Sequence, residues 1–383
     1  LMPFTPSAEL RFVFRAADPR CTAEQLLAIA SEVQHWERVA RLAESEGATA
    51  VLWRLLRPVA GQLPGELVLF LQARTMMADY RMQRLSARAQ ETVAALDAAG
   101  VAVVLLKGAA VGAMFDPTFR LRPMTDVDLL IREADAARAQ ATVAACGWQP
   151  MQDARLSELL QGHQHLPPYV DPTLEGLRLE LHTELLPPDS SFAFSAEELR
   201  AHSSPSPMAF AAARVPDPAR LLVHTAVHFA WQHEMQFAPW RTLRTAALLI
   251  DAPSWDWDAF IAVARAAMAH TCCYWTLRMG RLLCGLDVPP RVLAALAPPT
   301  LEPLRAMLDR HFTSLADPLE RPRSPSDNLT QWMWRLALRP RWSGLRRSDR
   351  RDPERRWERV MGTYQEEDGL SRVKRHVAAR RAW

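Results

Sequence analysis

The spacing of apolar residues predicts a helical first part of the chain that leads into a short strand. From residue 22 to residue 98 apolar positions recur every three or four residues, as on one face of a helix, and the last helix is expected from about Leu67 to Ala98. Gly100 suits the end of that helix, and the β-branched run Val101–Leu106 behind it predicts a strand. The segment Gly108–Met114 resembles the start of the next helix.

Two more strands and a second set of helices follow. Val127–Ile131 is an apolar run, and Leu177–His182 alternates strictly, so its leucines face a core while its polar residues face the other way. An Ala-rich helix is expected over residues 134–146, between these strands. After Pro216 helical spacing returns, and helices are predicted at 218–234, 240–251, 256–269, 272–285 and 299–315.

These elements predict an α+β fold that is mainly helical, with a small mixed sheet between two helical regions. The expected divisions are an N-terminal helical region at 1–98, an α/β core at 99–215, a C-terminal helical domain at 216–317 and a basic tail rich in Trp and Arg at 318–383. We interpret the tail as solvated amphipathic helices whose arginines cover apolar surface. Contact between the tail and nucleic acid is the alternative, because Arg and Trp are interleaved there.

Composition indicates the compartment. The five cysteines form no CxxC pair, which fits reduced thiols in a cytoplasmic protein. We expect no membrane span, because no apolar run reaches about 18 residues, and the first residues lack the pattern of a secretory signal. Arginine is used almost everywhere, so a single arginine carries little information. The chain contains only two lysines, and one of them, Lys107, stands directly before Gly108.

Two carboxylates in the middle part indicate a metal site. Asp126 and Asp128 lie two residues apart at the start of an apolar strand, so their side chains point the same way. Neighbouring carboxylates repel each other, and a bound cation such as Mg²⁺ removes that penalty. Lys107 beside a glycine turn suits a phosphate contact, although an exposed surface position is the alternative.

The motifs Leu-Lys-Gly at 106–108, Leu-Arg-Pro-Met-Thr-Asp-Val-Asp-Leu-Leu at 121–130 and Leu-Glu-Leu-His at 179–182 resemble the nucleotidyltransferase superfamily built on the DNA-polymerase-β palm. More closely, they are similar to a bacterial family described only as uncharacterised nucleotidyltransferases. The resemblance extends over roughly residues 25–315 and implies a palm-like sheet. It also implies transfer of a nucleotidyl group from an NTP, most simply AMP from ATP, to an oxygen of a small molecule, a peptide or a protein.

The resemblance also implies roles for individual residues. Asp126 and Asp128 would hold two Mg²⁺ or Mn²⁺ ions, with Glu180 as the third carboxylate on a neighbouring antiparallel strand. His182, on the same face as Glu180, would orient or deprotonate the acceptor. The nucleotide phosphates would meet residues of the turn and of the loop before the acidic strand, namely Lys107, Gly108, Arg120 and Arg122.

Two features depart from the superfamily pattern. The usual serine after the turn glycine is replaced by Ala109, and Gly108 and Asp126 stand 18 positions apart, a wide gap. These departures favour an alternative, a catalytically degenerate nucleotide-binding or regulatory module. A third hypothesis is an enzyme that adds nucleotides to RNA ends with help from the basic tail. Glu180 and His182 have their own alternative, the exposed face of an edge strand.

Histidines outside these motifs have two interpretations. His224 and His228 share a helical face and, with His233, suggest zinc, but no H-E-x-x-H pattern is present and core histidines are the better hypothesis. The pair His163 and His165 lies before two prolines and is interpreted as incidental, with contact to nucleotide or acceptor as the alternative.

Overall fold

The computed structural model describes residues 6–151, 164–173, 176–186, 190, 192–208, 210–298 and 302–316. Over these residues the protein has a mainly helical α+β fold around a mixed sheet of seven strands, as the sequence predicts. The predicted tail at 318–383 lies outside the described residues, and so does His163. The division of the chain into domains stays a prediction.

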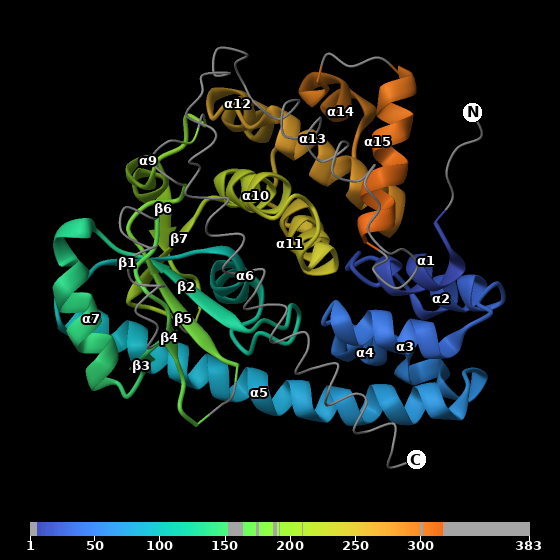
Figure 1. Cartoon of the computed structure of the whole chain (residues 1–383), viewed down its shortest axis with the longest axis horizontal. Coiled ribbons are helices and arrows are strands. Elements are labelled where there is room, and N and C mark those ends of the chain that lie inside the picture. The colour runs from blue at the N-terminus through green and yellow to red at the C-terminus, as the bar shows by residue number, and fades with distance from the viewer. Residues whose placement is uncertain are drawn as a thin grey trace.

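The N-terminal region is helical, as expected. It contains α1 (Ala8–Arg15), α2 (Ala23–Ala30), α3 (Trp36–Ser45), α4 (Thr49–Leu56), the 3-10 helix η1 (Arg57–Gln62) and α5 (Gly65–Ala98). Helix α5 is the predicted long helix. It runs along one edge of the molecule, against α3 and α4 near its start and towards β3 and α7 near its end (Figure 1). Helix α1 was not predicted, because the individual helices were predicted only from residue 22 onwards.

The sheet has the strand order β3-β4-β5-β2-β1-β7-β6. Its strands are β1 (Val103–Leu105), β2 (Asp126–Leu130), β3 (Gln149–Pro150), β4 (Tyr169–Val170), β5 (Arg178–His182), β6 (Ser203–Pro205) and β7 (Ala213–Pro216). The three predicted strands are β1, β2 and β5, and they lie side by side in the middle. The four remaining strands have two to four residues each, too few to show an alternating pattern.

The direction of β5 corrects one expectation. Strand β5 pairs with β2 in parallel, whereas an antiparallel neighbour was expected to carry Glu180. Parallel neighbours need a crossover of a dozen residues or more. Here the crossover contains the 3-10 helix η2 (Glu133–Asp135), α7 (Ala136–Ala145), β3 and β4, so the chain has room to return to the starting edge before β5.

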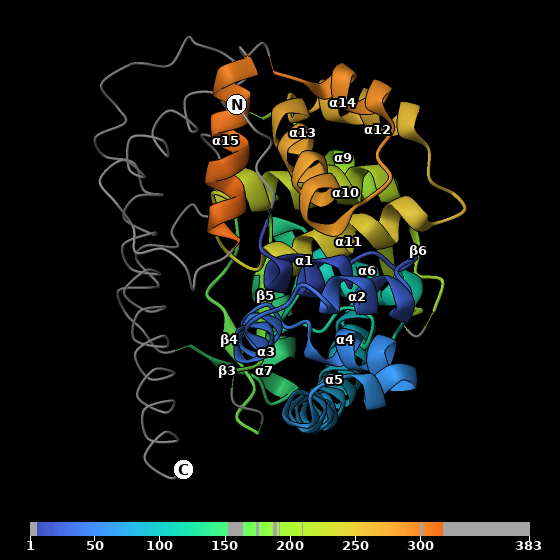
Figure 2. The ribbon, with the colours of Figure 1, turned by 90° about the vertical axis from the view of Figure 1, so that its right-hand side faces the viewer.

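Helices cover the sheet and continue into the C-terminal region. Helix α6 (Lys107–Phe115) follows β1, and α9 (Ala196–Ala201) precedes β6. The C-terminal helices are α10 (Pro218–Val227), the π-helix η3 (His228–Gln232), α11 (Pro239–Asp251), α12 (Trp257–Ala266), α13 (His270–Met279), the π-helix η4 (Gly280–Cys284), α14 (Pro290–Leu296) and α15 (Glu302–Leu315). Helices α12, α13 and α14 gather at the end of the molecule opposite α5 (Figures 1 and 2). Helix α10 begins as predicted, because Asp217 accepts a hydrogen bond from the backbone of Arg220.

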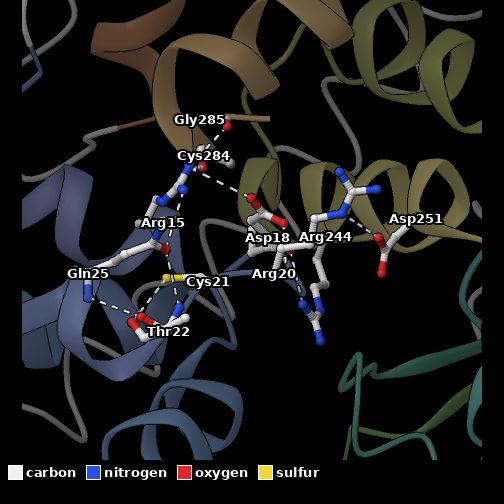
Figure 3. Close-up of polar contacts among 11 residues, drawn as sticks. Arg15, Asp18, Arg20, Cys21, Thr22, Gln25, Arg244, Asp251, Cys284 and Gly285 are labelled. Atoms are coloured by element: carbon white, nitrogen blue, oxygen red, sulfur yellow. Dashed lines mark hydrogen bonds and ion pairs between the residues drawn. The ribbon is translucent and has the colours of Figure 1, made fainter. Parts of the chain in front are cut away.

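Polar contacts tie the N-terminal and C-terminal helices together (Figure 3). Arg15 at the end of α1 donates to the carbonyl oxygens of Cys284 (2.6 Å) and Gly285 (3.0 Å). Gly285 has a φ of +68°, a conformation that favours glycine, and a Cβ there would lie 1.9 Å from the Arg15 guanidinium and would displace it. On α11, the buried Arg244 donates to the carbonyl oxygens of Ala17 (3.1 Å) and Leu121 (3.1 Å). Arg244 thereby holds the loop that leads into β2.

Candidate functional site

The candidate site is built on the paired strands β2 and β5. Asp128 and Glu180 lie directly opposite each other in the parallel register. Asp128 is buried, whereas Asp126 and Glu180 are partly exposed. His182 is also buried and belongs to the same strand face as Glu180. The structure therefore brings the predicted acidic and histidine side chains of β5 to the strand that carries the aspartate pair.

Asp128 is the centre of the polar contacts. Its Oδ1 atom lies 2.8 Å from the Nζ atom of Lys107, which donates from the start of α6. The same oxygen accepts from Nε2 of His182 at 2.9 Å. That nitrogen also lies 3.5 Å from Oε2 of Glu180. The interpretation of Lys107 as an exposed surface residue is wrong, because only 13% of its side chain is exposed and its ammonium is paired.

Charges in this cluster shift several pKa values. Burial opposes ionisation of Asp128, but Lys107 and His182 outweigh burial and hold its pKa well below the ordinary value. Burial opposes ionisation of Glu180 as well, yet His165 and His182 lower its pKa to about 2. Asp126 behaves differently, because burial and the charges of Asp128 and Glu180 raise its pKa. Burial opposes protonation of His182, but its hydrogen bonds with Asp128 and Glu180 raise its pKa, so two basic groups, Lys107 and His182, face the carboxylates.

The donor set fits a divalent cation. One ligand atom from each of Asp128, Glu180 and His182 can be chosen so that all three lie within 4.8 Å of one another. Carboxylate oxygens suit Mg²⁺ and Mn²⁺, and an imidazole is better suited to Mn²⁺ than to Mg²⁺. Asp126 is not part of this three-residue group, although its raised pKa reflects the nearby charges. A bound cation would relieve the repulsion that raises the pKa of Asp126.

The turn between β1 and α6 has a strained backbone. Lys107 has a φ of +44°, in the left-handed region that residues with side chains rarely adopt. The backbone of Leu106 donates to the carbonyl oxygen of Asp128 at 3.0 Å, which fixes the turn against β2. At Gly108 a Cβ would lie 2.3 Å from the Arg122 guanidinium and 2.8 Å from the Met124 sulfur. Glycine is therefore needed here for the close approach of Arg122.

The two candidate arginines lie in different surroundings. Nε of Arg122 donates to Thr245 (2.7 Å) and to the carbonyl oxygen of Arg241 (3.3 Å). Burial and the charge of Arg241 lower the pKa of Arg122 to about 10, while Asp126 and Asp128 oppose that shift. The structure does not bring Arg120 to the carboxylates. Its side chain is 45% exposed and lies 3.9 Å from Asp79 on α5. The phosphate contact predicted for Arg120 has no support from this geometry.

Two further residues lie near the site: sequence reasoning gave one of them, His165, only as an alternative and missed the other, Arg241. His165 is buried, its ring centroid lies 5.3 Å from that of His182, and it lowers the pKa of Glu180. The interpretation of His165 as incidental is therefore not supported, and its place beside His182 favours the alternative, a residue near the site. Arg241 on α11 acts on the pKa values of Asp126 and Arg122. In a chain so rich in arginine, nothing in the sequence distinguishes Arg241.

The three histidines of the C-terminal helices also lie close to the site. His224 is buried, as the core interpretation expects, and burial followed by the charge of Lys107 lowers its pKa to about 3. Burial and Lys107 likewise lower the pKa of His233 to about 4, and they lower that of His228. Among the described residues these histidines do not form a metal-binding group of three, so zinc finds no support.

The fold and the site define a class of protein. A strand, a Lys-Gly turn that opens a helix, and an acidic pair on the neighbouring strand form the arrangement expected of a nucleotidyltransferase. Residues 32–285, more than half of the chain, match the family model described as "Uncharacterised nucleotidyltransferase", and the chain belongs to this family. Comparison with curated proteins and with solved structures gives no match. In the part of the chain that the structure describes, no helix is long and apolar enough to cross a membrane.

Proposed function

We propose that the protein is a metal-dependent nucleotidyltransferase that moves a nucleotidyl group, most simply AMP from ATP, to an oxygen of a small-molecule, peptide or protein acceptor. The observation that carries the proposal is the convergence of Asp128, Glu180 and His182 beside Lys107. Membership of a nucleotidyltransferase family supports the same reaction class. ATP and the acceptor classes are proposals drawn from the resemblance.

Each residue has a role in this proposal. Asp128 and Glu180, with Asp126 beside them, would hold Mg²⁺ or Mn²⁺. When bound, the metal supplies charge neutralisation at the α-phosphate and at the leaving pyrophosphate. Lys107 and Arg122 would neutralise the β- and γ-phosphates from the turn and the adjacent loop. His182 would orient the acceptor hydroxyl or take its proton, since its Nδ1 has no hydrogen-bond partner among the described residues.

One observation favours a second candidate, the degenerate nucleotide-binding module. Oδ1 of Asp128 already accepts from both Lys107 and His182, so the protein's own cations occupy the oxygen that a metal ion would use. In an active enzyme these contacts must rearrange when metal and NTP bind. In a degenerate module they would persist, and the NTP would bind without turnover.

Labelled nucleotides separate these candidates. The purified protein is incubated with Mg²⁺ or Mn²⁺ and an NTP that is labelled either at the α-phosphorus or at the γ-phosphorus, in the presence of a panel of acceptors. Nucleotidyl transfer puts the α-label into the acceptor and the γ-label into pyrophosphate. Metal-dependent NTP binding without release of pyrophosphate would support the degenerate module. Transfer of the γ-label to the acceptor would contradict the proposed reaction.

A further inference from the structure

A cluster of flat side chains lies on α10, η3 and the loop that follows. We call His224, His228 and His233 the histidine cluster. The rings of His228 and His233 meet edge to face with centroids 4.3 Å apart, and His233 meets Phe237 in the same way at 5.4 Å. Phe237 is 44% exposed, so this row of rings extends from the buried His224 to the surface. A row of rings of this kind suits stacking with another flat ring.

His224 is the buried end of this row, and its polar atoms are unpaired. It is 1% exposed, and neither of its ring nitrogens has a hydrogen-bond partner among the described residues. A buried polar group without a partner destabilises a protein by about 1–3 kcal/mol, so such groups are rare in cores. A neutral imidazole offers one donor and one acceptor. Those two functions match the edge of a heterocyclic base.

The backbone around the cluster is strained. His228 begins the π-helix η3, and single-turn π-helices are frequent at functional sites. Beyond η3, Glu234, Met235 and Ala238 all have positive φ values, between 49° and 60°. Of the six described non-glycine residues in that conformation, these three share one short loop. Strain of this kind persists where the surrounding structure fixes the backbone for a purpose.

The cluster adjoins the acidic site. The charge of Lys107 acts on all three histidines, and the charges of Asp128 and His182 also act on His224. Helices α10 and α11 both pack on α6, the helix that begins with Lys107. The surroundings keep the three rings neutral, so they do not attract a phosphate. A ligand at this position must therefore present an uncharged, flat part towards the histidines and its charged part towards Lys107.

We propose that the histidine cluster and Phe237 bind the nucleobase of the NTP, with His233 and Phe237 as the stacking surface and His224 as the group that contacts the edge of the base. This inference rests on the proposed function, because it takes the triphosphate to lie at Lys107. The ribose would then lie between the α-phosphate at the carboxylates and the base at the histidines.

The test compares an NTP with inorganic triphosphate. Calorimetric titrations with Mn²⁺ measure the dissociation constants of a non-hydrolysable ATP analogue and of triphosphate alone. Phe237→Ala and His233→Ala should weaken binding of the analogue about five- to a hundredfold and leave triphosphate binding unchanged. His233→Phe should restore most of the affinity, because it keeps a flat ring. Leu282→Ala, which truncates an exposed apolar side chain on the other π-helix, η4, is the matched control and should change neither constant.

The role of His224 is tested by two further measurements, the melting temperature and the base preference of a variant. His224→Leu removes two unpaired buried nitrogens, so the melting temperature should stay the same or rise. The differences in affinity among the four NTP analogues should nevertheless become smaller, because the group that contacts the base edge is gone. A fall in melting temperature with an unchanged base preference would make His224 a structural residue and would overturn its assignment.

The outcomes distinguish this inference from the proposed function. If the analogue and triphosphate bind equally well and the Phe237 and His233 variants bind like wild type, the base site is overturned while the phosphate site stands. If neither ligand binds in the presence of Mn²⁺, the proposed function fails and the base site fails with it.

Discussion

Lys107 and Asp128 form an ion pair at the turn where β1 meets α6, with the ammonium 2.8 Å from Oδ1 of the carboxylate. The pair joins the most unusual basic residue of the chain to the more buried aspartate of the acidic pair. In the protein without ligand, the ammonium therefore supplies the positive charge that Asp128 needs. A metal ion and an NTP would take over that role and free Lys107 for the phosphates.

Loss of Lys107 should destabilise the metal-free protein. Lys107→Ala leaves Asp128 buried without its cation, and the free energy of unfolding should fall by about 3 kcal/mol, the low end for a buried pair, because 13% of the Lys107 side chain stays exposed. Mn²⁺ should recover part of this loss by binding the carboxylates of Asp128 and Glu180. Urea unfolding with and without Mn²⁺ measures both effects.

The pair of Arg88 and Asp171 offers the control for this experiment. It has a similar N···O distance of 2.9 Å and similarly low exposure, and neither residue is a main cause of the pKa shifts of Asp126, Asp128 and Glu180. Arg88→Ala should also destabilise the protein, but Mn²⁺ should not restore the loss. Equal recovery of both variants would mean that Mn²⁺ acts elsewhere.

A methyl group at Gly108 should disturb the phosphate contact. In Gly108→Ala the new Cβ would overlap the Arg122 guanidinium, at 2.3 Å, and must displace it. Binding of an NTP analogue in the presence of Mn²⁺ should weaken about tenfold, the equivalent of one charge-assisted hydrogen bond. Gly61→Ala is the control, since a Cβ there meets no atom within 4 Å. Unchanged affinity in Gly108→Ala would show that Arg122 does not contact the phosphates.

Glu46 should make stability depend on pH. Burial raises the pKa of Glu46 to about 7, although the backbone N–H of Trp240 donates to its carboxylate at 3.0 Å and Arg241 lies near. The unfolded chain has the ordinary pKa near 4.5. Between these pH values the folded state binds more protons than the unfolded chain. The contribution of protonated Glu46 to the free energy of unfolding is therefore lost as the pH rises from about 4.5 through about 7.

Glu46→Gln keeps an acceptor for Trp240 and removes the ionisation. We expect the variant to be more stable than wild type at pH 8 and similar to it at pH 4, as measured by thermal unfolding across this range. A variant that loses more stability at pH 8 than at pH 4 would show that the Glu46 carboxylate stabilises the protein in its charged form, and would contradict the raised pKa.

Much of the fold follows from local patterns in the sequence. The long helix α5, the central strands β1, β2 and β5, and the Asp217 cap of α10 all have residues that specify them directly. The short outer strands and the direction of β5 depend on tertiary contacts, which no short pattern encodes. The helical spacing over residues 218–234 also does not reveal that the helix changes to a π-helix at His228.

The candidate site was predictable only in part. Asp126, Asp128 and Glu180 stand in alternating strands, so their common face follows from the period of two. Arg241 reaches the site from a segment far away in the sequence and gives no signal there, and the loop position of His165 offered its contact with the site only as an alternative. Their positions depend on how β4 pairs with β5 and how α11 packs on α6.

The most direct test of the metal site is Mn²⁺ binding by the Asp128→Asn variant. Calorimetry with Mn²⁺ and a non-hydrolysable NTP analogue is compared for wild type, Asp128→Asn and Asp171→Asn, where Asp171 is a buried aspartate that pairs with Arg88 instead. We predict that wild type and Asp171→Asn bind Mn²⁺ with similar affinity and that Asp128→Asn, folded by circular dichroism, binds it at least about tenfold more weakly. Equal Mn²⁺ affinity in all three proteins would contradict the assignment of the acidic cluster as a metal site.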